Sequence, residues 1–203
     1  MSFSPPIRCP HIRSMEHILD RIGERVIITT CKLPVSQERL DNVPHLFRAM
    51  QEHGIKDLGQ VAYILATVAH ECTFRSIREI RAQPGTEVRR MQDRYWSSGY
   101  YGRGFCQLTW RRNYQKFSDL LNLPLVEQPD MVLQPQIGAD ILVLGMRDGL
   151  FSGRSLAHYI LGEKRDFIRA RRIVNGNFQA SRVAAHAERL YTLLLANSNQ
   201  VSV

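Results

Sequence analysis

Apolar residues recur at intervals of three and four along most of this chain, the spacing that places them on one face of an α-helix. The first clear stripe begins after Ser36, ends before Gly54, and consists of Leu40, Val43, Leu46, Phe47 and Met50. A second stripe follows directly and is made of Leu58, Val61, Leu65, Val68 and Cys72. The pattern therefore predicts two consecutive amphipathic helices that pack against a core.

The same spacing, punctuated by glycines, predicts further helices at residues 112–121, 135–147, 155–161, 166–174 and 181–196. Between residues 80 and 99 the chain is polar and irregular, and Pro84-Gly85 is a turn signal, so we expect a loop or a small hairpin there. Towards the N-terminus, Ile18 and Ile22 indicate one short helix, followed by a β-like I-I-T-T-C run. The chain is thus predicted to be mainly α-helical with little sheet.

The length of 203 residues and the hydrophobic content of 44% are sufficient for one sizeable domain with its own core. We interpret residues 35–203 as that domain and residues 1–34 as an N-terminal extension of unknown role. The excess of 27 Lys and Arg over 19 Asp and Glu gives a net charge of +8. Such a charge favours nucleic acid, anionic lipid or an acidic cell-wall polymer, and charge alone does not choose among them. A solvated basic face is an equally good interpretation.

The four cysteines show no C-x-x-C pairing, so the sequence supports neither a zinc site nor a disulfide scaffold: Cys9, Cys31, Cys72 and Cys106. Cys72 and Cys106 occupy apolar slots, where a buried inert thiol is a better interpretation than a nucleophile. His70-Glu71 lacks the second histidine of a zinc protease, because position 74 is Phe74. We therefore expect reduced thiols, no metal and no cofactor.

The N-terminus does not have the sections of a secretory signal, and no apolar run reaches the roughly 18–20 residues that span a bilayer. We expect a protein made in the cytoplasm, without stable membrane insertion.

The most distinctive stretch is residues 100–117, Y-Y-G-R-G-F-C-Q-L-T-W-R-R-N-Y-Q-K-F. Its glycines allow a close approach of backbone to a ligand, and Arg103 offers bidentate contacts. Gln107, Thr109 and Asn113 supply both hydrogen-bond donors and acceptors. This mixture is typical of a surface that grips a sugar polymer.

Together with A-Y-I-L-A-T-V-A-H-E-C at 62–72 and A-R-R-I-V-N-G at 170–176, this block resembles the family 19 glycoside hydrolases, in the branch that contains phage and bacterial chitinases and endolysins. The resemblance extends over about residues 40–195. It implies a lysozyme-like helical domain at 35–203 with a small β-hairpin or loop region beside an active-site cleft.

Glu71 lies near the end of the second predicted helix, at the border of its apolar stripe. Desolvation disfavours the charged form of a carboxyl group, which helps a general acid to retain its proton. A glutamate on a helix is usually a solvated charge, but the match of the H-E pair to the family assigns Glu71 the role of general acid.

Hydrolysis with inversion needs a second carboxylate, about 6.5–9.5 Å from the first, to activate water. Glu79 is the first candidate, and because an unbroken helix would carry it too far away, we expect the helix to end between Glu71 and Glu79. The family places its second glutamate beyond the catalytic helix, which agrees with Glu79. Glu87 and Asp93 remain rivals, and a salt bridge to a nearby arginine is the structural alternative for Glu79.

The resemblance implies that Thr109 orients the attacking water and that Gln107, Asn113 and Asn175 contact the sugar. Tyr101 and Trp110 offer faces to pyranose rings, although core packing explains these aromatics equally well. Arg103 is a candidate substrate contact, with a structural role that positions Glu79 as the favoured alternative. Arg171 and Arg172 are expected to complete a positive wall of the cleft.

These features predict a monomeric endolysin of the muramidase type, which hydrolyses β-1,4 bonds of peptidoglycan with Glu71 as acid and Glu79 as base. The absence of a secretion signal suggests release to the cell wall by a partner holin. A chitinase and a lytic transglycosylase are the enzymatic alternatives, and a nucleic-acid-binding protein is the alternative outside enzymes; the leading hypothesis involves no nucleic acid.

Overall fold

The computed structural model describes residues 15–198, and in this part of the chain helices predominate. The α-helices are α1 (Met15–Ile22), α2 (Glu24–Thr30), α3 (Gln37–Glu52), α4 (Leu58–Glu71), α5 (Glu87–Gln92), α6 (Arg111–Leu121), α7 (Pro135–Asp148), α8 (Leu156–Tyr159) and α9 (Ala180–Ser198). Three short 3₁₀ helices accompany them: η1 (Trp96–Ser98), η2 (Pro129–Leu133) and η3 (Arg169–Ile173).

Within residues 15–198, sheet is confined to two short antiparallel pairs. β1 (Ile77–Arg78) pairs with β2 (Arg103–Gly104), and β3 (Ile160–Leu161) pairs with β4 (Lys164–Arg165). The first pair joins the segment after α4 to the glycine-rich block. It therefore brings together two of the three motifs singled out in the sequence.

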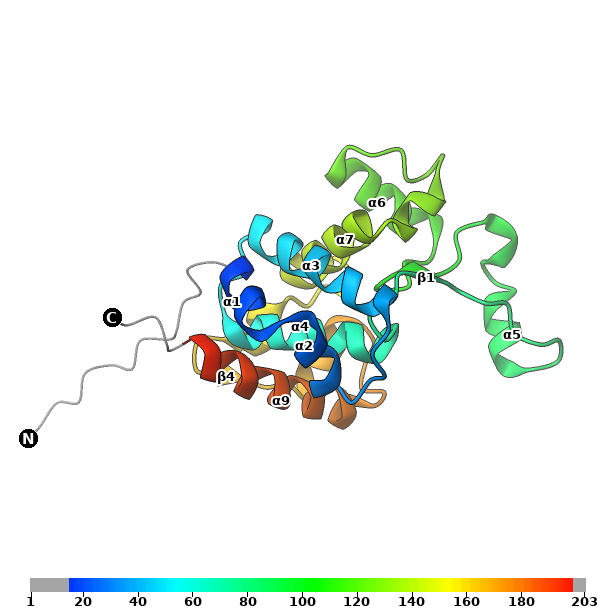
Figure 1. Cartoon of the computed structure of the whole chain (residues 1–203). Helices are drawn as coiled ribbons and strands as arrows, with labels where there is room; N and C mark the ends of the chain where they lie inside the picture. The colour runs from blue at the N-terminus through cyan, green and yellow to red at the C-terminus, as the bar shows by residue number, and fades with distance from the viewer. Residues whose placement is uncertain (1–14, 199–203) are drawn as a thin grey trace, which may run out of the picture.

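Helix α4 lies at the centre of the body, with α9 packed along it and with α3 and α7 packed against each other (Figure 1). Every residue of α4 from Leu58 to Ala69 except Gln60 is buried, which is typical of a helix surrounded by other elements. A second apolar cluster, which includes Tyr114, Phe117 and Ile141, lies between α6 and α7. The segment that carries α5 projects from the side of this body (Figure 1).

The long periodic segments fold as predicted. The helices expected at 112–121, 135–147 and 181–196 are present as α6, α7 and α9. Where the apolar pattern extended over only a few residues, the predictions were wrong. Residues 155–161 form only α8 before the chain enters β3, and residues 166–174 form only the 3₁₀ helix η3.

Another local prediction was also wrong, and one was incomplete. The I-I-T-T-C run is not β-like but belongs to helix α2, because Ile27 and Ile28 are both fully buried against neighbouring helices rather than alternating between two faces. Residues 80–99 form a loop rather than a hairpin, and the prediction missed the helix α5 within this loop. Thr86 starts this helix by accepting a hydrogen bond from the Arg89 N–H at 3.1 Å.

Residues 15–34 pack into the same core as the rest of the body. Ile18, Leu19, Ile22 and Cys31 are buried in the cluster that α4 and α9 dominate. Residues 1–14 lie outside the described part, and the division of the chain at residue 34 stays a prediction. Among residues 15–198, no helix has the length and apolarity required to cross a bilayer.

Asp57 fixes the start of α4, the helix that carries Glu71 at its other end. Its Oδ1 accepts hydrogen bonds from the N–H groups of Gly59 at 2.7 Å and Gln60 at 3.2 Å. Its Oδ2 accepts another from Gly162 N–H at 2.8 Å, in the turn between β3 and β4. One carboxylate thus caps the central helix and holds the β3–β4 hairpin against it.

We predict that Asp57→Ala lowers the free energy of unfolding by about 1–2 kcal/mol, because the N-terminal N–H groups of α4 lose their acceptor. Asp57→Asn retains one acceptor oxygen and should lose less. Urea denaturation followed by far-UV circular dichroism measures both variants. Equal losses for alanine and asparagine would contradict this role of the cap.

Candidate active site

Glu71 is the last residue of α4, and its side chain is 17% exposed. Its Oε1 lies 2.5 Å from Nη1 of Arg171, whose side chain is only 1% exposed. Arg171 belongs to η3, and its Nε also donates to the carbonyl oxygen of Phe178 at 3.0 Å. A buried guanidinium therefore anchors the candidate acid from a segment far along the chain.

The burial of Arg171 corrects the expectation that Arg171 and Arg172 together form a positive wall. Arg172 is exposed and donates from Nε to Asn177 Oδ1 at 3.1 Å, whereas Arg171 points into the protein. The available signal was local: Ala170 and Ile173, which flank this arginine pair, are both fully buried. An arginine within an apolar segment is usually paired, so Arg171 could have been predicted to need a carboxylate.

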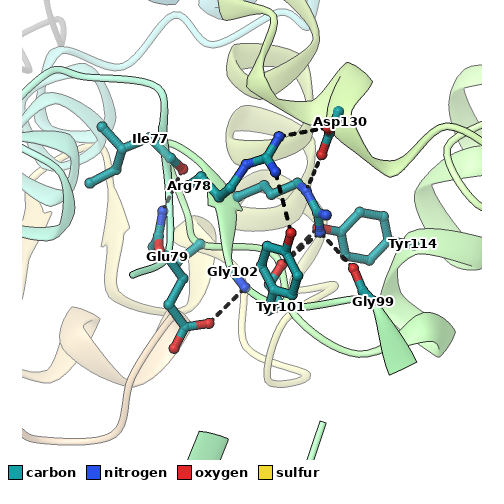
Figure 2. Close-up of polar contacts among 10 residues, drawn as sticks. Ile77, Arg78, Glu79, Gly99, Tyr101, Gly102, Tyr114 and Asp130 are labelled. Atoms are coloured by element: carbon teal, nitrogen blue, oxygen red, sulfur yellow. Dashed lines mark hydrogen bonds and ion pairs between the residues drawn. The ribbon is translucent and has the colours of Figure 1, made fainter. Parts of the chain in front are cut away.

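Glu79 follows β1, and its carboxylate is held by three donors. Oε1 accepts from Gln92 Nε2 at 2.9 Å and from the Tyr95 hydroxyl at 2.7 Å, and Oε2 accepts from the Gly102 N–H at 2.8 Å. The Glu79 N–H in turn donates to the Gly102 carbonyl at 2.8 Å. Figure 2 shows the Glu79 carboxylate facing the backbone nitrogen of Gly102.

Gln92 and Tyr95 were not identified from the sequence, because each reaches Glu79 across a loop rather than within a motif. Burial, and then the hydrogen bond and charge of Glu79, raise the pKa of the Tyr95 hydroxyl. Tyr95 therefore remains a hydrogen-bond donor to Glu79 at neutral pH.

The helix ends between the two glutamates, as predicted. After Glu71 the chain turns through Thr73 and Phe74, whose φ values of 52° and 59° are left-handed. This turn starts the segment that leads to β1. A threonine in this conformation is unusual for a β-branched residue.

The two rival carboxylates lie elsewhere, on the projecting α5 segment. Asp93 accepts hydrogen bonds from Arg81 at 2.8 Å and Arg89 at 2.9 Å. These hydrogen bonds, that of Arg81 first, hold the pKa of Asp93 below its ordinary value. Glu87 is exposed in the first turn of α5. Neither has the set of neutral donors that surrounds Glu79.

Four of the predicted site residues, Gln107, Thr109, Trp110 and Asn113, line one pocket of about 160 Å³. The Thr109 hydroxyl donates to the Gln107 carbonyl at 2.9 Å, and Asn113 Nδ2 donates to the Thr109 carbonyl at 2.7 Å. The ring of Trp110 meets that of Tyr95 edge-on, with centroids 5.2 Å apart. The pocket is thus linked through Tyr95 to Glu79.

Cys106 and Val174 also line this pocket, and Val174 belongs to the motif at residues 170–176. Asn175 follows Val174 and is exposed beside it in the chain. Burial is the main cause that raises the pKa of the Cys106 thiol to about 12, and the charge of Glu71 contributes. Glu71 therefore lies within electrostatic range of this pocket.

Gly102 is the point where Glu79, the candidate base, and the Gln107 amide meet. A Cβ atom at Gly102 would lie 2.8 Å from Gln107 Oε1 and 3.2 Å from Glu79 Oε2. Gln107 itself is fixed by hydrogen bonds from Nε2 to the carbonyls of Ile77 at 2.9 Å and Gly104 at 3.1 Å. A glycine is required at position 102, because a side chain there would collide with Gln107 and crowd Glu79.

Arg103 is 3% exposed, so its placement favours the structural role over substrate contact. Its Nε donates to Asp130 Oδ1 at 2.7 Å, and Nη1 donates to the carbonyls of Gly99 and Tyr101 at 2.9 and 3.1 Å. Arg78 reaches the other oxygen of Asp130 at 2.6 Å (Figure 2). The two arginines and Asp130 tie β1 and β2 to η2.

The ring of Tyr101 is covered by other side chains and so offers little surface to a sugar ring. Its ring stacks on Trp96, with centroids 4.4 Å apart and planes 14° apart, and the Arg103 guanidinium carbon lies 4.1 Å from its centroid. Trp110 is 36% exposed. Of the two predicted aromatics, Trp110 retains more surface for a sugar ring.

Within residues 15–198, no group of three or more His, Cys, Asp or Glu side chains is placed to hold a metal ion. The arrangement instead provides two glutamates in different environments, with a hydroxyl and two amides close by. Such an arrangement suits proton transfer at a polar substrate.

No family model matches the chain, and no curated protein matches its sequence. Among solved structures, it is similar to chitinase C from Streptomyces griseus HUT6037, with a TM-score of 0.62 and 19% identity over 85% of this chain and 92% of that chain. A mutant of chitinase C matches at a TM-score of 0.49 and 16% identity, covering 89% and 91% of the two chains, which is too low to support an argument. The first match confirms the predicted mainly α, lysozyme-like fold.

We predict that Arg103→Met lowers the free energy of unfolding by about 3 kcal/mol or more, because buried carbonyls lose their donor. Arg78→Met is the matched control: Arg78 pairs with the same Asp130, but its side chain is 47% exposed, so its loss should stay within about 1 kcal/mol. Urea denaturation of both variants makes the comparison. Similar losses would mean that Arg103 does not anchor the loop.

Proposed function

We propose that the protein is a glycoside hydrolase that cleaves β-1,4 bonds in the glycan strands of bacterial peptidoglycan. Glu71 is the general acid and Glu79 the general base. The observation that carries the proposal is the three-donor set around Glu79, next to a pocket of amide and hydroxyl groups. The three donors hold the carboxylate in one position, as a base that takes a proton from a defined water molecule requires.

In this mechanism Glu71 gives its proton to the glycosidic oxygen while a water molecule attacks the anomeric carbon from the opposite face. Glu79 takes the proton of that water, and the product has inverted configuration. Glu71 is left as a carboxylate, and Arg171, 2.5 Å away, stabilises that charge.

The pocket residues position the other reactants. The Thr109 hydroxyl orients the attacking water, since a hydroxyl both donates and accepts. Gln107, Asn113 and Asn175 contact the hydroxyl and N-acetyl groups of the sugars, and Trp110 packs against a ring.

The net charge of +8 favours a polymer with carboxylates, such as peptidoglycan, over neutral chitin. The proposed setting is the cell wall of a bacterium in whose cytoplasm the protein is made, with release by a holin and action as a monomer. The fold shared with chitinase C supports chitin as the second candidate substrate.

We predict that Glu71→Gln and Glu79→Gln each reduce glycan cleavage about a hundredfold or more, because each removes one proton-transfer group. The measurements are turbidity loss of cells with permeabilised outer membranes and release of reducing ends from purified sacculi. Glu87→Gln is the matched control, since Glu87 is an exposed carboxylate on the neighbouring segment, and it should retain wild-type activity.

Normal lysis by Glu71→Gln would remove the proposed acid. If Glu79→Gln remained active while Glu87→Gln or Asp93→Asn did not, the base would be one of the rivals.

Soluble chitooligosaccharides and sacculi offered in parallel decide the substrate. Mass spectrometry of the products separates hydrolysis from transglycosylation, because only a lytic transglycosylase leaves an anhydro-muramyl end. A nucleic-acid-binding protein would instead show steeply salt-dependent DNA binding that Glu71→Gln leaves unchanged.

The thiols should be chemically inert in the folded protein. Burial raises the pKa of Cys31, Cys72 and Cys106 to about 12 in each case. We predict that iodoacetamide at about pH 8 modifies these three residues only after unfolding, because the thiolate is the reactive form. Peptide mass spectrometry checks the labelling, and Cys106→Ser should retain glycan cleavage. Rapid labelling of native Cys106 with loss of activity would favour a cysteine nucleophile.

A further inference from the structure

A larger pocket, of about 530 Å³, lies between the C-terminal end of α4, the first half of α9 and the connection from α2 to α3. We call it the basic pocket, and its polar lining includes Lys32, His70, Thr73, Arg182, His186 and Arg189. None of its lining residues is acidic, and none is Phe, Tyr or Trp. The mechanism proposed above uses none of these side chains.

The positive charge of the basic pocket is not neutralised by the protein. Arg189 is engaged, because it donates from Nη2 to His186 Nδ1 at 2.8 Å and from Nε to the Thr30 carbonyl at 3.1 Å. The side chains of Lys32 and Arg182, in contrast, form no hydrogen bond or ion pair with the part of the chain that the structure describes. Two cations therefore remain available to a ligand.

His186 reports the local electrostatics. It is 8% exposed, and burial first, followed by the charges of Arg189, Arg182, His70 and Lys32, lowers its pKa to about 4. The charged groups that lower this pKa are all basic, so the electrostatic potential at His186 is positive, which favours an anion nearby.

Three lining residues also adopt left-handed backbone conformations, which L-residues other than glycine rarely do. Lys32, Thr73 and Gln179 have φ values of 57°, 52° and 53°. They are three of the seven non-glycine residues with positive φ in the described chain. Such strain, of order 1–3 kcal/mol per residue, concentrates at binding sites.

We propose that the basic pocket binds an acidic peptide through its carboxylates, and that this peptide is the stem attached to a peptidoglycan strand. The link to the glycan strand rests on the proposed function. Arg182 and Lys32 pair with carboxylates, and Thr73 and Gln179 bond peptide amides.

Two observations favour a peptide over other anions. The volume of about 530 Å³ exceeds the size of a phosphate ion and falls within the range of pockets that hold drug-sized molecules. The lining has no Phe, Tyr or Trp, the large rings on which single-stranded nucleic acid usually stacks its bases.

The basic pocket is close to the candidate acid. His70 lines it and directly precedes Glu71. The charges of both Glu71 and Arg182 act on the pKa of His70, which burial chiefly lowers. A stem held in the basic pocket therefore lies beside the residue that precedes Glu71, so the pocket would distinguish a peptide-bearing strand from a bare one.

The test is isothermal titration of the full chain with a sugar-free stem tripeptide, alanyl-glutamyl-diaminopimelate, at low ionic strength. We expect Arg182→Gln and Lys32→Gln each to weaken binding about tenfold, and Arg182→Lys to restore most of it. Arg25→Gln is the matched control, because it removes the same charge from an exposed position on α2 outside the pocket. Melting temperatures verify that the variants are folded.

The proposal is overturned if the tripeptide does not bind, if Arg182→Gln and Arg25→Gln bind it equally, or if inorganic phosphate binds more tightly than the tripeptide. Because the tripeptide has no glycosidic bond, Glu71→Gln should bind it normally. Binding that depends on Arg182 in a protein that cleaves no glycan would overturn the proposed function but support the peptide site. Cleavage without such binding would overturn the peptide site alone.

Discussion

The ion pair between Glu71 and Arg171 is the constraint on which the arrangement of this protein depends. A guanidinium that is 1% exposed needs a partner, because an unpaired charge of this kind costs several kcal/mol. The fold provides one by bringing the end of α4 against η3, although the two segments are far apart in sequence. The same contact fixes where α4 ends and which way its last side chain points, and the basic pocket is lined by residues of that end.

A second constraint is steric and lies on the other side of the site. Gly102 lies against both Glu79 and Gln107, so one residue without a side chain sets the position of the candidate base and of an amide in the neighbouring pocket. Left-handed backbone conformations also gather at the two pockets. Five of the seven residues other than glycine that have a positive φ line one pocket or the other: Lys32, Thr73, Gln107, Trp110 and Gln179. The strain of the described chain is concentrated where ligands would bind.

The sequence predicted the long helices because their apolar spacing persists over several turns, and it predicted the end of α4 because Glu79 had to lie off that helix. It did not predict the helical form of Ile27 and Ile28, since a short apolar run has no period that separates helix from strand. The donors to Glu79 were invisible for another reason. Gln92 and Tyr95 meet Glu79 only through tertiary contact, and no spacing rule relates them. The same holds for the partner of Arg171.

The support of Glu79 has an energetic consequence. Gln92 is the only buried residue of α5, and Tyr95 belongs to the same projecting segment (Figure 1). Ile80, Val88 and Met91 of this segment are among the exposed large apolar side chains. A segment with so little buried surface opens at a lower free-energy cost than the helical body. Heating should therefore release Glu79 from its donors while α4 and α9 are still packed, so the candidate site comes apart before global unfolding.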